Sequence, residues 1–235
     1  MRRILITGAS GGLGLIIAEN LIKKGFFVIL VANKNIEKVN KLNELHPNQS
    51  KVIQKDFLET FNSEEFVNQV GTIDSIIHTL GVSSSNVSWK TSNSEWNKVI
   101  KLNLTIPFEI SSAFIPMLRE NKFGRIIFFS SVVGQIGVFG TTAYSASKSG
   151  LIGLTKSLAV ELIQKNITVN CIAPGYMNQG MIKEIDDSQL ELIKQKIPNH
   201  QLGDSMNIVN SVLFLLDENS DYITGQVINV NGGIY

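Results

Sequence analysis

The sequence has 235 residues, of which 43% are hydrophobic and 17% charged, and its 21 basic and 20 acidic residues leave a net charge of +1. This balance excludes a disordered chain, and the near-neutral charge argues against nucleic acid as a partner. The single cysteine, Cys171, excludes an internal disulfide and is expected to be a buried core thiol. No apolar run approaches the roughly 20 residues of a membrane span. The opening run stops at Gly8, too early for a signal peptide, so we expect a cytoplasmic protein without membrane contact.

Apolar runs alternate with helically spaced segments from one end of the chain to the other. The runs that predict strands span residues 3–7, 26–31, 51–55, 73–79, 124–130, 167–173 and 226–230. The segments that predict helices span residues 13–24, 36–45, 94–119, 142–165 and 208–216.

The strands are apolar throughout rather than alternating, which is typical of strands buried on both faces. Strands separated by helices predict a parallel sheet with right-handed crossovers. We therefore expect one α/β domain over residues 1–235, with a Rossmann-type doubly wound parallel sheet of about seven strands and helices on both faces. Ligands bind such sheets outside the carboxyl ends of the strands. Two long loops, residues 81–93 and 175–203, are expected to emerge there.

A glycine-rich turn follows the first strand, where residues 7–14 read Thr-Gly-Ala-Ser-Gly-Gly-Leu-Gly. Gly8 can turn tightly, Gly12 leaves space for a phosphate, and Gly14 lets the helix pack close to the sheet. The start of a helix offers free N–H groups and partial positive charge to a pyrophosphate. A merely flexible loop is the alternative, but the position between strand and helix favours dinucleotide binding. The residues assigned to it are Gly8, Ser10, Gly12, Leu13 and Gly14.

The end of the second strand bears on which nicotinamide dinucleotide is bound. A carboxylate there would hold the 2′-hydroxyl of NAD and repel the 2′-phosphate of NADP. The chain instead has Ala32, Asn33 and Lys34, which favours NADP(H), with NAD(H) still possible. We assign Asn33 and Lys34 to the cofactor, the alternative for Lys34 being an ordinary solvated lysine that starts the next helix.

Tyr144 and Lys148 are spaced i, i+4 in a helical segment, so their side chains share a face. An ammonium group beside a phenol is expected to lower the phenol pKa from about 10, which suits proton exchange with a carbonyl oxygen. Ser131 follows the fifth strand, and its hydroxyl can bond the reacting oxygen. A chance surface pair and a turn serine are the alternative interpretations. The three residues together, downstream of a glycine turn, predict a catalytic site.

The glycine pattern of residues 7–14 and the order Ser131, Tyr144, Lys148 resemble the short-chain dehydrogenase/reductase family over essentially the whole chain. Residues 150–159 and 231–235 make it most similar to the 3-oxoacyl-acyl-carrier-protein reductases within that family. The resemblance implies a reductase that uses NAD(P)H to convert a carbonyl, most of all a 3-oxoacyl thioester on an acyl carrier, into an alcohol.

The resemblance also implies roles that the residues alone do not establish. Asn103 would hold a water behind the lysine and complete a tetrad, and Asp56 with Phe57 would contact the adenine. A turn or helix-capping role is the alternative for Asp56. Further cofactor contacts are implied at Gly81, Tyr144, Lys148, Pro174, Gly175, Met177 and Gln179. No metal is implied.

The chain departs from the family at two places. The family usually has Asn-Asn-Ala-Gly after the fourth strand, whereas this chain has His-Thr-Leu-Gly at residues 78–81, and we expect His78 to be structural. After Pro174 and Gly175 the family often has a threonine that meets the nicotinamide carboxamide. Here Gln179 takes that place, and its amide can substitute.

Two other functions are compatible with the same fold. An alcohol or sugar dehydrogenase would use the same fold and catalytic residues. A nucleotide sensor without turnover is the third hypothesis, against which the complete tetrad argues.

The long segments 94–119 and 142–165 carry more apolar residues than one inward stripe needs. Since the resembled family pairs these helices between subunits, we expect a homotetramer, with Ile110, Ala113 and Phe114 on its interface.

Overall fold

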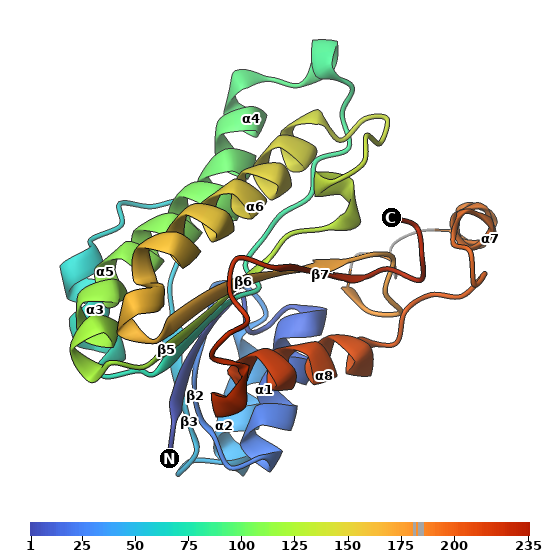
Figure 1. Ribbon diagram of the computed structural model, residues 1–235. Coiled ribbons are helices and arrows are strands. Elements are labelled where there is room, and N and C mark those ends of the chain that lie inside the picture. Colours follow the sequence, from blue (N-terminus) through green and yellow to red (C-terminus); the bar gives the residue numbers. More distant parts are fainter. Residues whose placement is uncertain (181, 183–185) are drawn as a thin grey trace.

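The computed structural model describes residues 1–180, 182 and 186–235. Its seven strands form one parallel sheet in the order β3-β2-β1-β4-β5-β6-β7 (Figure 1). The strands are β1 Arg3–Thr7, β2 Phe27–Ala32, β3 Ser50–Gln54, β4 Ser75–His78, β5 Gly124–Phe129, β6 Ile167–Pro174 and β7 Val227–Val230. The chain order reverses between β1 and β4, which is the point where such sheets bind ligands. The predicted doubly wound Rossmann-type sheet is confirmed.

Helices cover both faces of the sheet (Figure 1). One face carries α1 Gly12–Lys23, α2 Ile36–Leu45 and α8 Ser205–Leu216. The other carries α3 Ser63–Val70, α4 Asn93–Ile100, α5 Ile106–Asn121 and α6 Thr142–Leu162. The short helix α7 Asp187–Lys196 stands apart from both layers.

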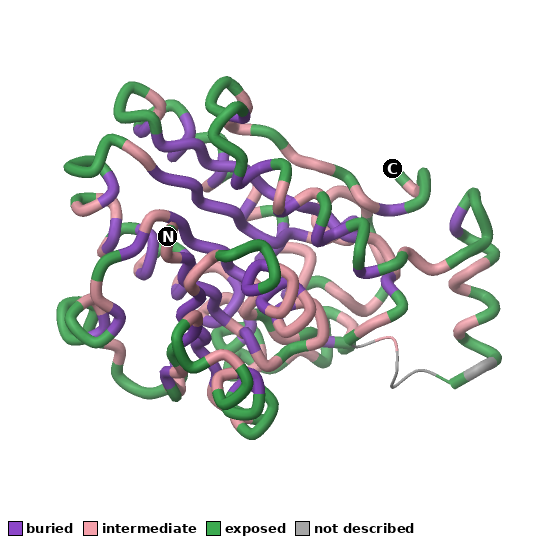
Figure 2. The backbone as a smooth tube through the Cα atoms, turned by 90° about the horizontal axis from the view of Figure 1, so that it is seen from below, coloured by how far each residue is buried: buried purple, intermediate pink, exposed green. Residues whose placement is uncertain are grey.

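The core consists of two apolar clusters separated by the sheet. Successive residues of a strand point to opposite faces, so Leu5 joins one cluster and Ile4 and Ile6 join the other. Figure 2 shows the buried strands crossing the centre of the molecule, with exposed segments around them. Cys171 on β6 is fully buried, as expected for a core thiol.

The predicted helix over residues 94–119 is wrong as a continuous α-helix. Between α4 and α5 lies a π-helical turn, Lys101–Thr105, and such turns often occur at functional sites. Two helices, α3 and α7, were not predicted from the sequence. In α3 only Phe66 and Val70 are buried, which is too short a pattern to reveal the helical period.

Two residues that were expected at a subunit interface belong to the core of the chain itself. Ile110 and Phe114 are both 0% exposed, and with Ile106 and Leu118 they form the inward stripe of α5. The expectation that they face a partner is therefore wrong, because the i, i+4 row that they occupy points at the sheet. The large apolar side chain of α5 that is exposed to solvent is Phe108.

No helix within the described residues combines the length and the apolar character that a membrane span requires. Over residues 1–180, 182 and 186–235, no group of three or more His, Cys, Asp or Glu side chains is placed to hold a metal ion.

Candidate active site

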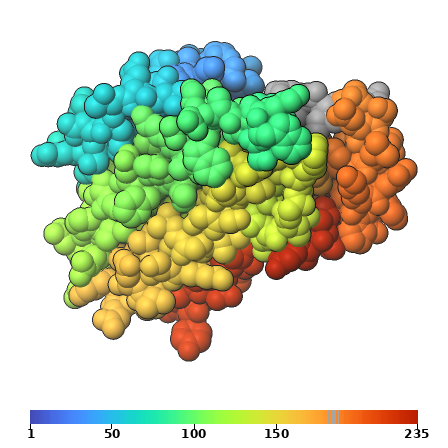
Figure 3. All heavy atoms as spheres, turned by 90° about the horizontal axis from the view of Figure 1, so that it is seen from above, coloured from blue at the N-terminus to red at the C-terminus, as the bar shows by residue number. Residues whose placement is uncertain are grey.

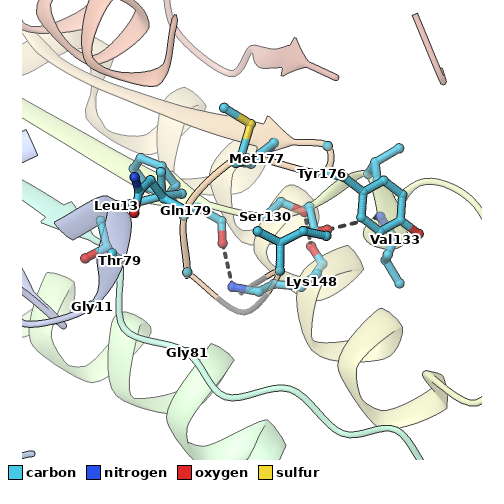
Figure 4. Close-up of a pocket in the computed structure, with 18 of the residues that line it drawn as sticks. Gly11, Leu13, Thr79, Gly81, Ser130, Val133, Lys148, Tyr176, Met177 and Gln179 are labelled. Carbon is cyan, nitrogen blue, oxygen red and sulfur yellow. Dashed lines mark hydrogen bonds between the residues drawn. The ribbon is translucent and has the colours of Figure 1, made fainter. Parts of the chain in front are cut away.

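A cavity of about 460 Å³ opens at the carboxyl ends of the strands (Figure 4). Its walls come from the glycine turn, the end of β4, the end of β5, the start of α6 and the segment that follows β6. Most of the predicted site residues line it, namely Gly12, Leu13, Gly14, Gly81, Ser131, Tyr144, Lys148, Pro174, Gly175, Met177 and Gln179.

The glycine turn brings backbone close to backbone. Gly8 has a φ of +73°, which favours glycine. A Cβ atom on Gly14 would lie 2.5 Å from the Gly8 oxygen, and one on Gly12 would lie 2.7 Å from the Gly180 nitrogen. Each glycine is therefore required by a close approach, and Gly12 faces the segment after β6 across the turn.

The first turn of α1 suits an anion. Gly11 is the N-cap residue, no side chain among the described residues caps this helix end, and the first turn holds no acidic residue. The N–H groups of that turn are free to bind phosphate oxygens, and the helix dipole adds partial positive charge. Together with the cavity beside Gly12, this arrangement fits the pyrophosphate of a dinucleotide.

Tyr144 and Lys148 lie on the first turns of α6 and face the cavity together. The Lys148 Nζ atom lies 5.6 Å from the centre of the Tyr144 ring and donates a 2.7 Å hydrogen bond to the Phe129 oxygen at the end of β5. The Ser131 Oγ atom accepts a 3.2 Å hydrogen bond from the Val133 nitrogen. The structure thus brings the three predicted catalytic residues into one cavity.

Burial governs the protonation of this pair. It raises the pKa of Tyr144, while hydrogen bonding with Ser131 acts in the opposite direction. Burial also lowers the pKa of Lys148 to about 8. The expected lowering of the Tyr144 pKa by Lys148 is not found in this structure, where desolvation of the phenol raises the pKa and only Ser131 opposes it. Near neutral pH the phenol keeps its proton and the amine remains mostly charged.

Asn103 sits in the π-helical turn and does not line the cavity itself. Its Nδ2 atom donates to the Val82 oxygen at 2.9 Å and to the Ser147 Oγ atom at 3.0 Å, and its Oδ1 atom accepts from the Val82 nitrogen at 2.8 Å. A Cβ atom on Gly81 would lie 3.3 Å from Lys148 Nζ and 3.4 Å from Asn103 Oδ1. Asn103 therefore fixes the start of the loop after β4 and lies close behind Lys148.

The residues assigned to the adenosine end lie outside the cavity. Ser10 Oγ donates to the Lys34 oxygen at 2.7 Å, which ties the glycine turn to the end of β2, and the Lys34 side chain is exposed. Asp56 accepts from the Leu58 nitrogen at 2.8 Å, the bond of a turn aspartate.

Phe57, which was assigned to the adenine, lies in the core. Its ring is buried and packs edge-on against Phe61 and Phe66. Phe57 is absent from the residues that line the cavity, and its assignment to the adenine stays a prediction. Asn33 is half-buried at the same end of the sheet.

Several lining residues were not predicted from the sequence. His78 is buried and absent from the lining, as expected for a structural histidine, but its neighbour Thr79 reaches the cavity. The other unpredicted lining residues are Gly11, Phe129, Ser130, Val132, Val133, Tyr176, Gly180 and Ile182. Most of them adjoin a predicted residue, so the carboxyl ends of the strands were the signal that could have found them.

Comparison with known proteins agrees with this geometry. The sequence model of the short chain dehydrogenase family matches residues 2–190. The chain is 39% identical to a 3-oxoacyl-acyl-carrier-protein reductase of Buchnera aphidicola over 98% of this chain and 96% of the relative, and 39% identical to one of Rickettsia bellii over 98% and 95%. The solved reductase of the same name from Brucella melitensis has a TM-score of 0.91 and 29% identity, covering 100% of this chain and 91% of that one.

The chain therefore belongs to the short-chain dehydrogenase/reductase family. It is an oxidoreductase, and the family implies a nicotinamide cofactor.

The buried lysine has a consequence for stability. Because the pKa of Lys148 falls from 10.5 to about 8 on folding, the unfolded chain binds more protons between these values, so stability rises with pH across that window. At pH 7 the buried charge destabilises the fold. We predict that Lys148→Met stabilises the ligand-free protein at pH 7 by roughly 1–3 kcal/mol, or several degrees in Tm, and that this gain shrinks toward pH 10.

Calorimetry at the two pH values tests this prediction. Lys156→Met, an exposed position on the same helix, is the matched control and should change Tm little. A Lys148→Met protein that is less stable than wild type at pH 7 would contradict the argument.

Proposed function

We propose that this protein uses NADPH to reduce a 3-oxoacyl thioester, carried on an acyl carrier protein, to the 3-hydroxyacyl form. The observation that carries the proposal is the convergence of Ser131, Tyr144 and Lys148 on one cavity beside the uncapped start of α1. The full-length similarity to reductases of this name supports the choice of substrate.

The residues at the carboxyl edge of the sheet would hold the dinucleotide. The N–H groups around Gly12 would bind its pyrophosphate, and Pro174, Gly175 and Gln179 would hold its nicotinamide end. Asn33 and Lys34 would hold its adenosine end, where the Lys34 ammonium would pair with a 2′-phosphate. When bound, the reduced nicotinamide supplies the hydride.

Tyr144 acts as the general acid. The substrate carbonyl lies between the hydroxyl groups of Ser131 and Tyr144, both of which donate to its oxygen. Because burial raises the pKa of Tyr144, the phenol keeps its proton until negative charge develops on that oxygen. The nearby ammonium of Lys148 then stabilises the phenolate that remains.

We predict that the wild-type protein oxidises NADPH with a 3-oxoacyl thioester and that Tyr144→Phe lowers kcat at least 100-fold while retaining NADPH binding. The substitution keeps the ring and removes only the proton donor. Steady-state kinetics and a fluorescence titration of NADPH measure the two effects.

A panel of ketones, sugars and 3-oxoacyl thioesters tests the substrate class. Faster turnover of a sugar or simple ketone would contradict the proposed substrate and would favour an alcohol or sugar dehydrogenase. Dinucleotide binding without turnover on any member would favour a sensor. A Tyr144→Phe protein that retains more than a tenth of wild-type kcat would remove Tyr144 from its role.

We predict a higher kcat/KM for NADPH than for NADH, since no acid stands at the end of β2. Ala32 is buried in the core, whereas Asn33 is half-buried, so Asn33→Asp is the substitution that places a carboxylate near the ribose. It should shift the preference toward NADH by repelling the 2′-phosphate, and Asn33→Ala serves as the uncharged control. Equal kcat/KM values for the two cofactors in wild type would overturn the assignment.

We propose a homotetramer in which α4, α5 and α6 pair with the same helices of a second subunit, and a second interface near the C-terminal strand β7 joins two such pairs. These helices lie side by side on one face of the molecule, in green and yellow in Figure 3. With Ile110 and Phe114 in the core, the large apolar side chains exposed on these three helices are Trp96, Phe108 and Val160, at 39%, 46% and 79%. Gly153 on α6 is also exposed, and beyond its own helix backbone a Cβ atom there would meet no described residue within 4 Å.

We predict that Gly153→Glu dissociates the assembly without unfolding the subunit, because Glu favours helix more than Gly and clashes only with a partner. Sedimentation equilibrium at micromolar concentration measures the mass, with Gly153→Ala as the matched control. Wild type at the 25.9 kDa chain mass would refute the assembly, and an unchanged Gly153→Glu oligomer would refute this interface.

A further inference from the structure

The segment that leaves β4 departs from the usual family pattern and lies directly against the glycine turn. The Thr79 nitrogen and the Thr79 Oγ1 atom both donate to the Thr7 oxygen, at 3.1 and 2.7 Å. Thr7 is the last residue of β1, and its carbonyl group forms the peptide bond to Gly8. The peptide at which the turn begins is therefore held by two hydrogen bonds from Thr79, the first residue after β4.

The same segment fills the space that two glycines leave open. A Cβ atom on Gly14 would lie 2.7 Å from Thr79 Oγ1, and one on Gly8 would lie 2.6 Å from the Leu80 nitrogen. Figure 4 places Thr79 beside the start of α1, at the edge of the cavity. The turn and the first residues of α1 are thus packed onto Thr79 and Leu80.

His78, the last residue of β4, fixes the start of this segment through its buried contacts. It is 2% exposed, stacks on Phe128 with 5.1 Å between the ring centres, and lies between Thr7 Oγ1 at 3.4 Å and Ser111 Oγ at 3.0 Å. Burial lowers the pKa of His78 to about 3, so the ring is neutral and has one donor and one acceptor nitrogen for these hydroxyl groups. The contact therefore persists unchanged across the physiological pH range.

We propose that Thr79 is a positioning residue for the phosphate-binding turn, and that its hydroxyl fixes the Thr7–Gly8 peptide from which the N–H groups of α1 are aimed. The inference rests on the proposed function, in which those N–H groups hold the dinucleotide pyrophosphate. The role lies in cofactor affinity and not in the transfer of hydride or proton, since the Thr79 hydroxyl bonds the turn, whereas the proposed proton donor Tyr144 and its partner Lys148 come from α6.

Thr79→Val removes the hydroxyl at nearly constant volume, and Thr79→Ser restores it. We expect Thr79→Val to weaken binding of NADPH and of ADP-ribose about three- to tenfold, the usual value of one hydrogen bond, with kcat at saturating NADPH changed less than twofold. Thr79→Ser should bind both ligands within twofold of wild type. Isothermal titration measures affinity without turnover, and ADP-ribose has the pyrophosphate but no nicotinamide.

Thr155→Val is the matched control, because Thr155 is also buried and its hydroxyl donates to the Leu151 oxygen within α6. It should lower Tm without changing either affinity. Wild-type affinity in Thr79→Val, an equal loss in Thr79→Ser, or a loss for NADPH alone would overturn the inference. A wild-type protein that binds neither NADPH nor ADP-ribose would instead refute the proposed function.

Discussion

The whole site depends on one steric constraint, which is the approach of backbone to backbone where β1 turns into α1. A Cβ atom on Gly8 would come within 2.6 Å of the Leu80 nitrogen, and one on Gly14 within 2.5 Å of the Gly8 oxygen. Because only glycine permits both approaches, α1 can begin at the carboxyl edge of the sheet, between β1 and β4. Its partial positive charge then faces the cavity that holds Tyr144 and Lys148.

A second constraint is desolvation, which acts on the stability of the fold and on catalysis at once. Lys148 is 5% exposed and its amine donates to the carbonyl of Phe129, so its charge is only partly compensated in the ligand-free chain. The same burial keeps the Tyr144 phenol protonated. A group that stabilises charge only as the charge develops contributes to the transition state more than to the ground state. In the proposed function, burial therefore lowers the local stability of the fold while it keeps Tyr144 protonated as the acid.

The sequence was sufficient for features that follow from local pattern. Strands buried on both faces are apolar throughout, and the glycine turn and the Ser131, Tyr144, Lys148 order could be recognised directly. Features set by tertiary contact could not be predicted in this way. The orientation of Ile110 toward the core depends on which side of α5 packs on the sheet, and the burial of Phe57 depends on the rings of Phe61 and Phe66.

The altered motif after β4 shows that such a position is defined by hydrogen-bond geometry as well as by residue type. What the turn requires is a donor to the Thr7 carbonyl and a backbone that fits against Gly8. The hydroxyl and the N–H group of Thr79 meet the first need, and the backbone at Leu80 meets the second. A neutral histidine then satisfies the hydroxyl groups behind it without introducing a charge. Asn103 follows the same logic at Val82, where one amide pairs with both backbone groups of a loop residue. Side chains on the central elements thus fix the backbone of the segments that line the cavity, and a motif can change its residues while the site keeps its shape.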